Sequence, residues 1–230
     1  MSLKPKKHSD QKKIAEKMKQ KKSKMNTKYQ LPPYTLIVSE GVKTEPLYLE
    51  GLVNKINSQY KDLIKGKHIE IYGTGRNTRG LLKYVDKRIA NGEWSHFEKI
   101  WLVYDKDDFP EDNFDNTQIS VENRKDSLNK IKVAWSNESF ELWVLLHFQD
   151  YTVDNGRDDY IKKINQYIDY SKSREDLYEA VTTVGSLEDA KVRARKQYED
   201  FANQGIITPS KMVPATRVYE LVEELERYVH

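Results

Sequence analysis

Residues 99–109 read KIWLVYDKDDF, an apolar run that ends in a group of carboxylates. Five consecutive apolar residues bounded by charge are typical of a strand buried on both faces, as in a parallel sheet covered by helices. Asp105 then follows at the carboxyl end of this strand, where open α/β sheets bind their ligands. Because successive side chains of a strand alternate, we expect Asp105 and Asp107 on the same face.

Two carboxylates on one face favour a bound cation. Like charges this close would push a proton onto one of them, whereas Mg²⁺ keeps both ionised and takes their oxygens as ligands. The alternative is that residues 105–108 form a turn or cap the next helix, which is the commoner use of an isolated Asp-x-Asp.

The flanking sequence predicts strands that alternate with helices. We expect strands over 34–39, 67–72 and 131–135, and helices over 43–56, 79–90, 120–130, 160–170, 187–201 and 217–228. Strands separated by helix-length patterns favour right-handed β-α-β units, and hence an α/β fold with a mainly parallel sheet flanked by helices. Residues 137–148 are too densely apolar for a surface helix and should be buried against the sheet.

Composition limits the class of protein. With 230 residues and 37% hydrophobic content, the chain is long enough to bury a core. It has no cysteine, which excludes disulfides and thiolate metal sites and agrees with a reducing compartment. The longest apolar run in the carboxyl half, residues 142–146, is too short to cross a membrane. We therefore expect a cytoplasmic protein without membrane association.

The charge is distributed unevenly along the chain, and it suggests three segments. Residues 1–28 hold eleven lysines, Asp10 and Glu16, which leaves the rest of the chain at −6 although the whole carries +3. We predict a basic, flexible arm over 1–30, a main domain over 31–150 and a helical carboxyl-terminal extension over 151–230. The arm would attract phosphate backbones, and a solubilising tail is the equally weighted alternative.

A second acidic turn follows the first predicted strand. Glu40 precedes Gly41, which permits a sharp turn at the same edge of the sheet as Asp105. If the first and third strands are neighbours, Glu40 should converge with Asp105 and Asp107. A glutamate beside a carboxylate-bound Mg²⁺ can act as ligand or as general acid and base for a phosphodiester oxygen.

Four sequence blocks together resemble one known family. EGVKTEP at 40–46, GTGRNT at 73–78, the Asp-x-Asp at 105–107 and SNESFELWVLLHF at 136–148 occur in this order. The same blocks are typical of the RloB and AbiL-type phage-resistance proteins. A strand ending in Glu-Gly and a later one ending in Asp-x-Asp is also similar to the Toprim fold of topoisomerases, primases and OLD-type nucleases. The resemblance covers about residues 34–150.

The resemblance implies a Toprim-like, Mg²⁺-dependent endonuclease that cuts DNA or RNA in anti-phage defence, with Mn²⁺ as a substitute. It also implies an AAA/ABC-type ATPase partner, and it leaves a homo-oligomer open. Glu40 takes the acid and base position, and Asp105 with Asp107 hold the metal. Glu45 and Glu141 are our candidates for completing a second metal site, because two-metal hydrolysis needs more than three carboxylates.

Both of these glutamates have an alternative role. Glu45 could simply complement the dipole in the first turn of a helix. Glu141 lies in an apolar helix where an unpaired charge is costly, so it either faces the metal or pairs with a buried arginine or lysine.

Two further groups could bind phosphate. The loop with Gly73, Gly75, Arg76 and Asn77 precedes a helix, so its N–H groups and the arginine could hold an anion, although Asn77 could instead cap the helix. Lys43 could neutralise charge in a transition state, or it could be a solvated lysine.

A non-catalytic subunit is the rival interpretation of the whole chain. Such a subunit would keep the Toprim shape and bind nucleic acid or the ATPase without cutting. A phosphatase-like enzyme is less favoured, because the nucleophile of a phosphatase usually follows the first strand, where this chain has Glu40.

Overall fold

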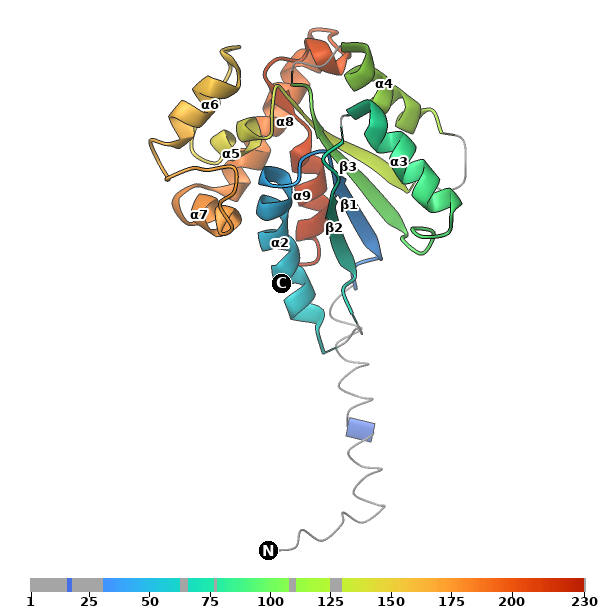
Figure 1. Ribbon diagram of the computed structural model, residues 1–230. Coiled ribbons are helices and arrows are strands. Elements are labelled where there is room, and N and C mark those ends of the chain that lie inside the picture. The colour runs from blue at the N-terminus through green and yellow to red at the C-terminus, as the bar shows by residue number, and fades with distance from the viewer. Residues whose placement is uncertain are drawn as a thin grey trace, which may run out of the picture.

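The computed structural model describes residues 16–17, 31–62, 66–76, 78–107, 111–124 and 130–229. Figure 1 shows a layered molecule in which helices lie on both sides of a central sheet. Nearly all of the predicted arm over 1–30 lies outside the described residues, as does Asn77 of the predicted phosphate loop.

Five strands form one sheet in the order β2-β1-β3-β4-β5. β1 (Thr35–Ser39) lies between β2 (Ile69–Gly73) and β3 (Lys99–Asp105), β4 (Ile131–Asn137) follows, and these four strands are parallel. The short β5 (Ala215–Thr216) pairs antiparallel with β4. The predicted α/β fold with a mainly parallel sheet is confirmed, and the arrangement is consistent with a Toprim-like fold.

Helices cover both faces of the sheet (Figure 1). One face is covered by α3 (Thr78–Ala90) and α4 (Glu111–Glu122). The other is covered by α2 (Thr44–Tyr60), α5 (Glu141–Leu146) and α9 (Val218–Glu226). Three more helices pack around α2, α5 and α9: α6 (Gly156–Ile164), α7 (Leu177–Val184) and α8 (Leu187–Asn203). A 3-10 turn at Pro209–Lys211 precedes β5.

The side chains of β3 alternate between the two cores. Ile100, Leu102 and Tyr104 face α3 and α4. Trp101 and Val103 face α2, α5 and α9. All five side chains are buried, as expected for a central strand covered on both faces. The same alternation places Asp105 on the side of α2 and α5.

The helix predicted over 120–130 is matched only in part: α4 covers Glu111–Glu122, residues 123 and 124 are not helical, and residues 125–129 lie outside the described ones. Phe114, Gln118 and Val121 form the buried stripe of α4 at helical spacing. The middle position is polar because the Trp135 indole N–H donates to Gln118 Oε1 at 2.6 Å. Because this buried position is a glutamine, the regular spacing of apolar residues that predicts a helix is interrupted here.

The carboxyl-terminal residues extend the same sheet and the same core. Besides β5, helix α9 contributes Glu224, whose carboxylate lies 2.8 Å from Lys99 Nζ and 2.5 Å from Lys132 Nζ. These ion pairs tie α9 to β3 and β4. In the described part of the chain, no helix combines the length and apolar character that crossing a membrane requires.

Candidate functional site

The two predicted acidic turns meet at the carboxyl edge of the sheet. β1 and β3 are neighbours, as expected, with Ser39 in register with Val103. The Glu40 N–H donates to the Val103 carbonyl at 2.8 Å, so the chain after β1 stays bound to β3 up to the turn. Beyond β3, the N–H of Asp107 donates to the Glu138 carbonyl at 3.1 Å.

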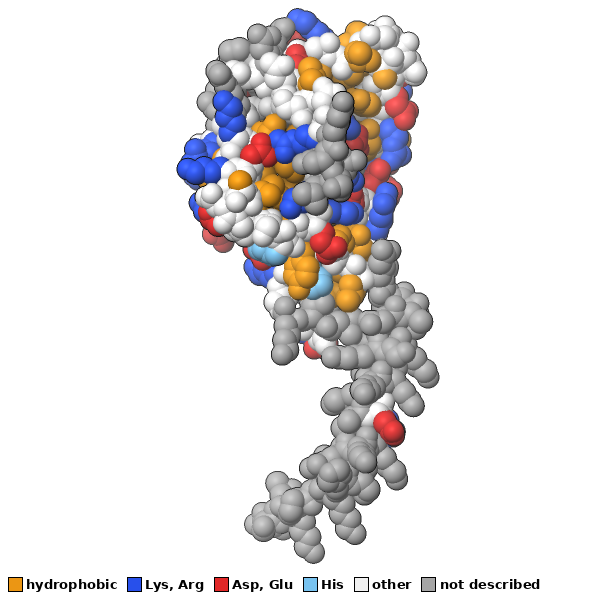
Figure 2. Space-filling model, turned by 90° about the vertical axis from the view of Figure 1, so that its right-hand side faces the viewer, with side chains coloured by type: hydrophobic (Ala, Val, Ile, Leu, Met, Phe, Trp, Pro, Cys, Tyr) orange, Lys and Arg blue, Asp and Glu red, His pale blue; other side chains and the backbone are white. Residues whose placement is uncertain are grey.

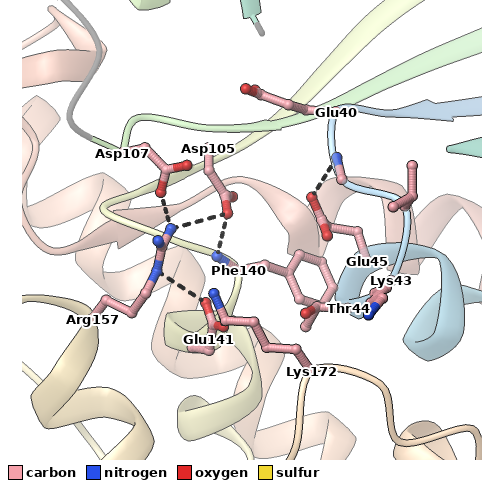
Figure 3. A pocket seen from close by; sticks show the side chains of 12 residues that line it. Glu40, Lys43, Thr44, Glu45, Asp105, Asp107, Phe140, Glu141, Arg157 and Lys172 are labelled. Atoms are coloured by element: carbon pink, nitrogen blue, oxygen red, sulfur yellow. Dashed lines mark hydrogen bonds and ion pairs between the residues drawn. The ribbon is translucent and has the colours of Figure 1, made fainter. Parts of the chain in front are cut away.

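A cavity of about 240 Å³ opens at this edge (Figure 3). Its lining combines carboxylates and cations from five parts of the chain. They are Glu40, Lys43 and Glu45 around the start of α2, Asp105 and Asp107 at the end of β3, Glu141 of α5, Arg157 of α6, and Lys172 after α6. The structure thus brings all six predicted catalytic and metal-binding residues to one cavity.

In Figure 3 the Glu40 carboxylate and the carboxylates of the two aspartates lie on opposite sides of the strand ends. Because Ser39 pairs with Val103, Glu40 is in register with Tyr104, which faces α3 and α4. There Thr78, the first residue of α3, donates its hydroxyl to Glu40 Oε2 at 2.8 Å. Burial raises the pKa of Glu40 to about 7, although the hydrogen bond from Thr78 acts in the opposite direction. A carboxyl group with this pKa can both give and accept a proton near neutral pH.

Asp105 is buried, and only one of its two carboxylate oxygens has a hydrogen-bond partner among the described residues. Its Oδ2 accepts the Phe140 N–H at 3.0 Å, whereas its Oδ1 is buried and has no hydrogen-bond partner among the described residues. Burial, and then the nearby charges of Glu45 and Glu141, raise the pKa of Asp105 well above its ordinary value. A buried acceptor without a donor is costly, so this oxygen favours a further ligand.

Arg157 is one of two cations of this site that the sequence analysis missed, the other being Lys172. The Nη2 of Arg157 contacts Asp107 Oδ1 and lies 3.9 Å from Asp105 Oδ2, while its Nε lies 3.6 Å from Glu141 Oε2. Figure 3 shows the guanidinium between the three carboxylates. The one signal in the sequence was Glu141 itself, whose burial requires a cationic partner.

Glu141 has further partners on its other oxygen. Tyr170 donates its hydroxyl to Glu141 Oε1 at 3.0 Å, and Lys172 Nζ lies 3.6 Å from the same atom. Of the two alternatives for Glu141, the structure shows the pairing with cations, and a role at a metal site stays a prediction.

The backbone of Gly41, four residues earlier, fixes the position of the Glu45 carboxylate. Glu45 Oε1 accepts the Gly41 N–H at 3.1 Å, which folds the carboxylate back over the turn. A Cβ at Gly41 would lie only 2.3 Å from Glu45 Oε2, so a side chain there would displace the carboxylate. Burial raises the pKa of Glu45, and the charge of Glu141 acts in the same direction.

The donor set fits a hard divalent cation by its chemistry. All the candidate ligands are carboxylates, and Asp105, which lines the cavity, has one buried oxygen without a partner among the described residues. As the side chains lie, however, no three His, Cys, Asp or Glu residues of the described ranges are grouped closely enough to hold a metal ion. The guanidinium of Arg157 lies where these carboxylates would have to converge, so their role as metal ligands stays a prediction.

The predicted phosphate loop lies beside this cavity and packs against its rim. A Cβ at Gly73 would lie 2.9 Å from the Gly41 carbonyl oxygen, so glycine permits the two turns to touch. Thr74 donates both its N–H and its hydroxyl to the Ser39 carbonyl at 3.0 Å. Gly75 has a positive φ of 61°, and the Arg76 side chain lies on α3 rather than in the cavity.

Comparison with known proteins identifies a family. Residues 35–225 match a family model described as RloB-like protein, a range that includes every residue of the cavity. No curated protein and no solved structure matches the chain.

Proposed function

Because the chain belongs to the RloB-like family, associated in general with defence and abortive infection, we propose that it is a divalent-metal-dependent nuclease of anti-phage defence. The observation that carries the proposal is the cavity at the carboxyl edge of the sheet. Carboxylates from distant segments line it, and one buried oxygen of Asp105 has no partner among the described residues. This is the edge at which parallel α/β sheets place their chemistry.

The carboxylates would divide the work as follows. Asp105 and Asp107 would hold Mg²⁺ or Mn²⁺, and Glu45 with Glu141 would complete a second site if two ions bind. When bound, such an ion supplies Lewis-acid stabilisation of charge on the phosphodiester. The Phe140 N–H holds Asp105 and the Gly41 N–H holds Glu45, whereas Asp107 and Glu141 would exchange their contacts with Arg157 for the ion.

Glu40 is suited to proton transfer rather than to metal binding. Its carboxyl group faces Thr78 instead of the aspartates, and its pKa of about 7 allows it to take a proton from one oxygen or give one to another. Lys43 lines the same cavity and is exposed, so it could approach a phosphate from the solvent side.

Arg157 must leave its present position for this chemistry to occur. In the absence of metal it neutralises Asp105, Asp107 and Glu141, which would otherwise repel one another. A bound divalent cation would take over that neutralisation. The side chain is partly exposed, so it can turn toward solvent.

The same arginine favours the second candidate, a non-cutting subunit. An ion-pair network around Arg157 would stabilise a Toprim-like scaffold that binds nucleic acid or a partner ATPase and holds no metal. For either function we propose a cytoplasmic location, an AAA/ABC-type ATPase partner and nucleic acid as the target, and we leave self-association open.

A cleavage assay separates the two candidates. The full chain is incubated with labelled DNA, RNA and transfer RNA, in Mg²⁺, in Mn²⁺ and in EDTA. We expect metal-dependent cutting by the wild type and by the control Asp158→Asn, an exposed acid of α6, but not by Asp105→Asn or Glu40→Gln. Cutting that persists in both variants or in EDTA excludes the nuclease proposal, and absence of cutting in the wild type favours the non-cutting subunit.

A further inference from the structure

A second polar hollow lies along α3, outside the carboxylate cavity. It measures about 590 Å³, and we call it the α3 groove; its lining is Arg76, Gly80, Lys83, Tyr84, Lys87, Arg88, Asn91 and Glu93. Figure 2 views the molecule from the side of α3 and α4 and shows lysine and arginine side chains spread over this face, with apolar side chains between them.

The basic residues of the α3 groove form a stripe along one helix face. Lys83 and Lys87 are four residues apart and exposed, with Tyr84 and Arg88 beside them. No carboxylate of the described residues lies within ion-pair distance of either lysine. The one acid of α3, Asp86, is bonded instead to Arg124 at 2.7 Å. Within the described ranges, both ammonium groups are therefore open to an anionic ligand.

Three aromatic rings form a platform next to these cations. The ring of Trp94 lies 5.5 Å from those of Tyr72 and Tyr84, and the two tyrosines stack at 6.2 Å. Arg76 lies over the Tyr84 ring at 4.4 Å, and Arg88 lies over it at 5.0 Å. Tyr72 is 43% exposed, which is high for an aromatic ring in a cluster.

The α3 groove leads toward the carboxylate cavity. Thr78 begins α3 and hydrogen-bonds Glu40, and Arg76 lies just before it in the chain. Arg88 lies ten residues after Thr78, which is about 15 Å along the helix. A strand bound along α3 would therefore reach Glu40 at one end.

We propose that the α3 groove binds single-stranded nucleic acid. The phosphates would lie along Lys83, Lys87 and Arg76, and bases would stack on the aromatic platform of Tyr72, Tyr84 and Trp94. Stacking on aromatic rings beside a basic groove is how proteins hold single strands with little sequence preference, and paired bases in a duplex cannot present their faces in this way. This inference rests on the proposed function in one respect, since the groove would deliver substrate to the same site.

The test uses the full chain in EDTA, so that no cutting occurs, and labelled single strands of oligothymidine and oligouridine. We compare Lys83→Ala/Lys87→Ala with Lys162→Ala/Lys196→Ala, a pair of exposed lysines on α6 and α8 with the same change in charge. We expect roughly tenfold weaker binding for the first pair alone. The slope of log affinity against log salt should fall by about 1.4, or about 0.7 for each lost phosphate contact.

Tryptophan fluorescence reports the stacking directly. Of the four tryptophans, Trp101, Trp135 and Trp143 are buried, and Trp94 is partly exposed and contacts Tyr84 of the α3 groove. Single strands should quench the emission, and Trp94→Phe should abolish the quenching. Equal affinity loss in both lysine pairs, an unchanged emission, or equal quenching by a duplex of the same length would overturn the inference.

The two proposals fail in different ways. If the wild type binds single strands through the α3 groove but cuts nothing in metal, the nuclease proposal fails and the groove stands. If the wild type cuts while Lys83→Ala/Lys87→Ala binds and cuts like its control, the groove fails and the nuclease proposal stands.

Discussion

At the scale of single residues, the guanidinium of Arg157 sets the charge balance of the candidate site. It lies among Asp105, Asp107 and Glu141, of which Asp105 and Glu141 are buried. Removing one partner of a buried charge network costs more than the network itself contributes, because the other charges stay buried without compensation. The stability of the metal-free protein should therefore depend on this side chain.

We predict that Arg157→Met lowers the free energy of unfolding by about 2 kcal/mol without metal, a value reduced for the partial exposure of the arginine. Added Mg²⁺ should restore more stability to this variant than to the wild type, since the ion replaces the lost cation. Urea unfolding with and without Mg²⁺ measures both effects. Arg174→Met, which breaks the exposed pair with Asp176, is the control, and Mg²⁺ that stabilises neither protein would contradict the prediction.

His147 is a packed histidine and does not line the cavity of the candidate site. Its Nδ1 lies 3.0 Å from the Trp143 carbonyl, which can only accept, so Nδ1 carries the proton and Nε2 accepts the Tyr48 hydroxyl at 2.8 Å. Burial lowers the pKa of His147 to about 4. The folded state therefore keeps this ring neutral at pH values where the unfolded chain binds a proton.

A pH dependence follows from this difference. Between about pH 6.5 and pH 4 only the unfolded state is protonated at this residue, so the folded protein loses stability as the pH falls. We predict that the stability advantage of the wild type over His147→Gln shrinks by about 3 kcal/mol from pH 7 to pH 4. Chemical unfolding of both proteins across this range measures it, and an advantage that stays constant would be inconsistent with a neutral buried ring.

At the scale of elements, strands and turns were predicted correctly where the local pattern of apolar and charged residues reflects which residues are buried. The apolar run of β3 and the Glu-Gly turn after β1 placed two strands and two acidic turns at one edge. The prediction failed where residues distant in the sequence pair with each other. A polar residue, Gln118, interrupts the apolar pattern on the buried face of α4, and nothing in the sequence near Arg157 indicates its ion pair with Asp107, fifty residues earlier. The orientation of Glu40 also depends on strand register, which the sequence leaves open.

The contact between α2 and α7 gives a prediction at this scale. Gly51 lies within α2, where a Cβ would come 2.3 Å from Tyr178 Cβ of α7. Alanine favours a helix over glycine by about 1 kcal/mol, but overpacking costs about 1–3 kcal/mol. We expect Gly51→Ala to lower the free energy of unfolding by about 1 kcal/mol, and Glu50→Ala, an exposed neighbour, to change it little. A Gly51→Ala variant with a higher free energy of unfolding than the wild type would contradict this prediction and show that α2 and α7 can move apart at little cost.

At the scale of the whole molecule, opposite charges are separated into different regions. Carboxylates gather at the carboxyl edge of the sheet, while lysines and arginines extend along α3, where Arg88 pairs with Glu93. Residues 1–28 carry a further +9, against −6 for the rest of the chain. This separation suits a protein that attracts a polyanion to one surface and binds a small cation at another. The domain division at 150 stays a prediction. β5 and α9 lie after residue 150, yet they belong to the sheet and the core of the segment before it.

The central claim, that the carboxylate cavity binds a divalent cation, is tested most directly by calorimetric titration of the full chain with Mg²⁺ or Mn²⁺. We predict saturable binding to the wild type and to Asp158→Asn, and at least about tenfold weaker binding to Asp105→Asn, which loses a charged ligand and about 1.4 kcal/mol or more of binding energy. Absence of binding in the wild type, or unchanged affinity in Asp105→Asn, would contradict it.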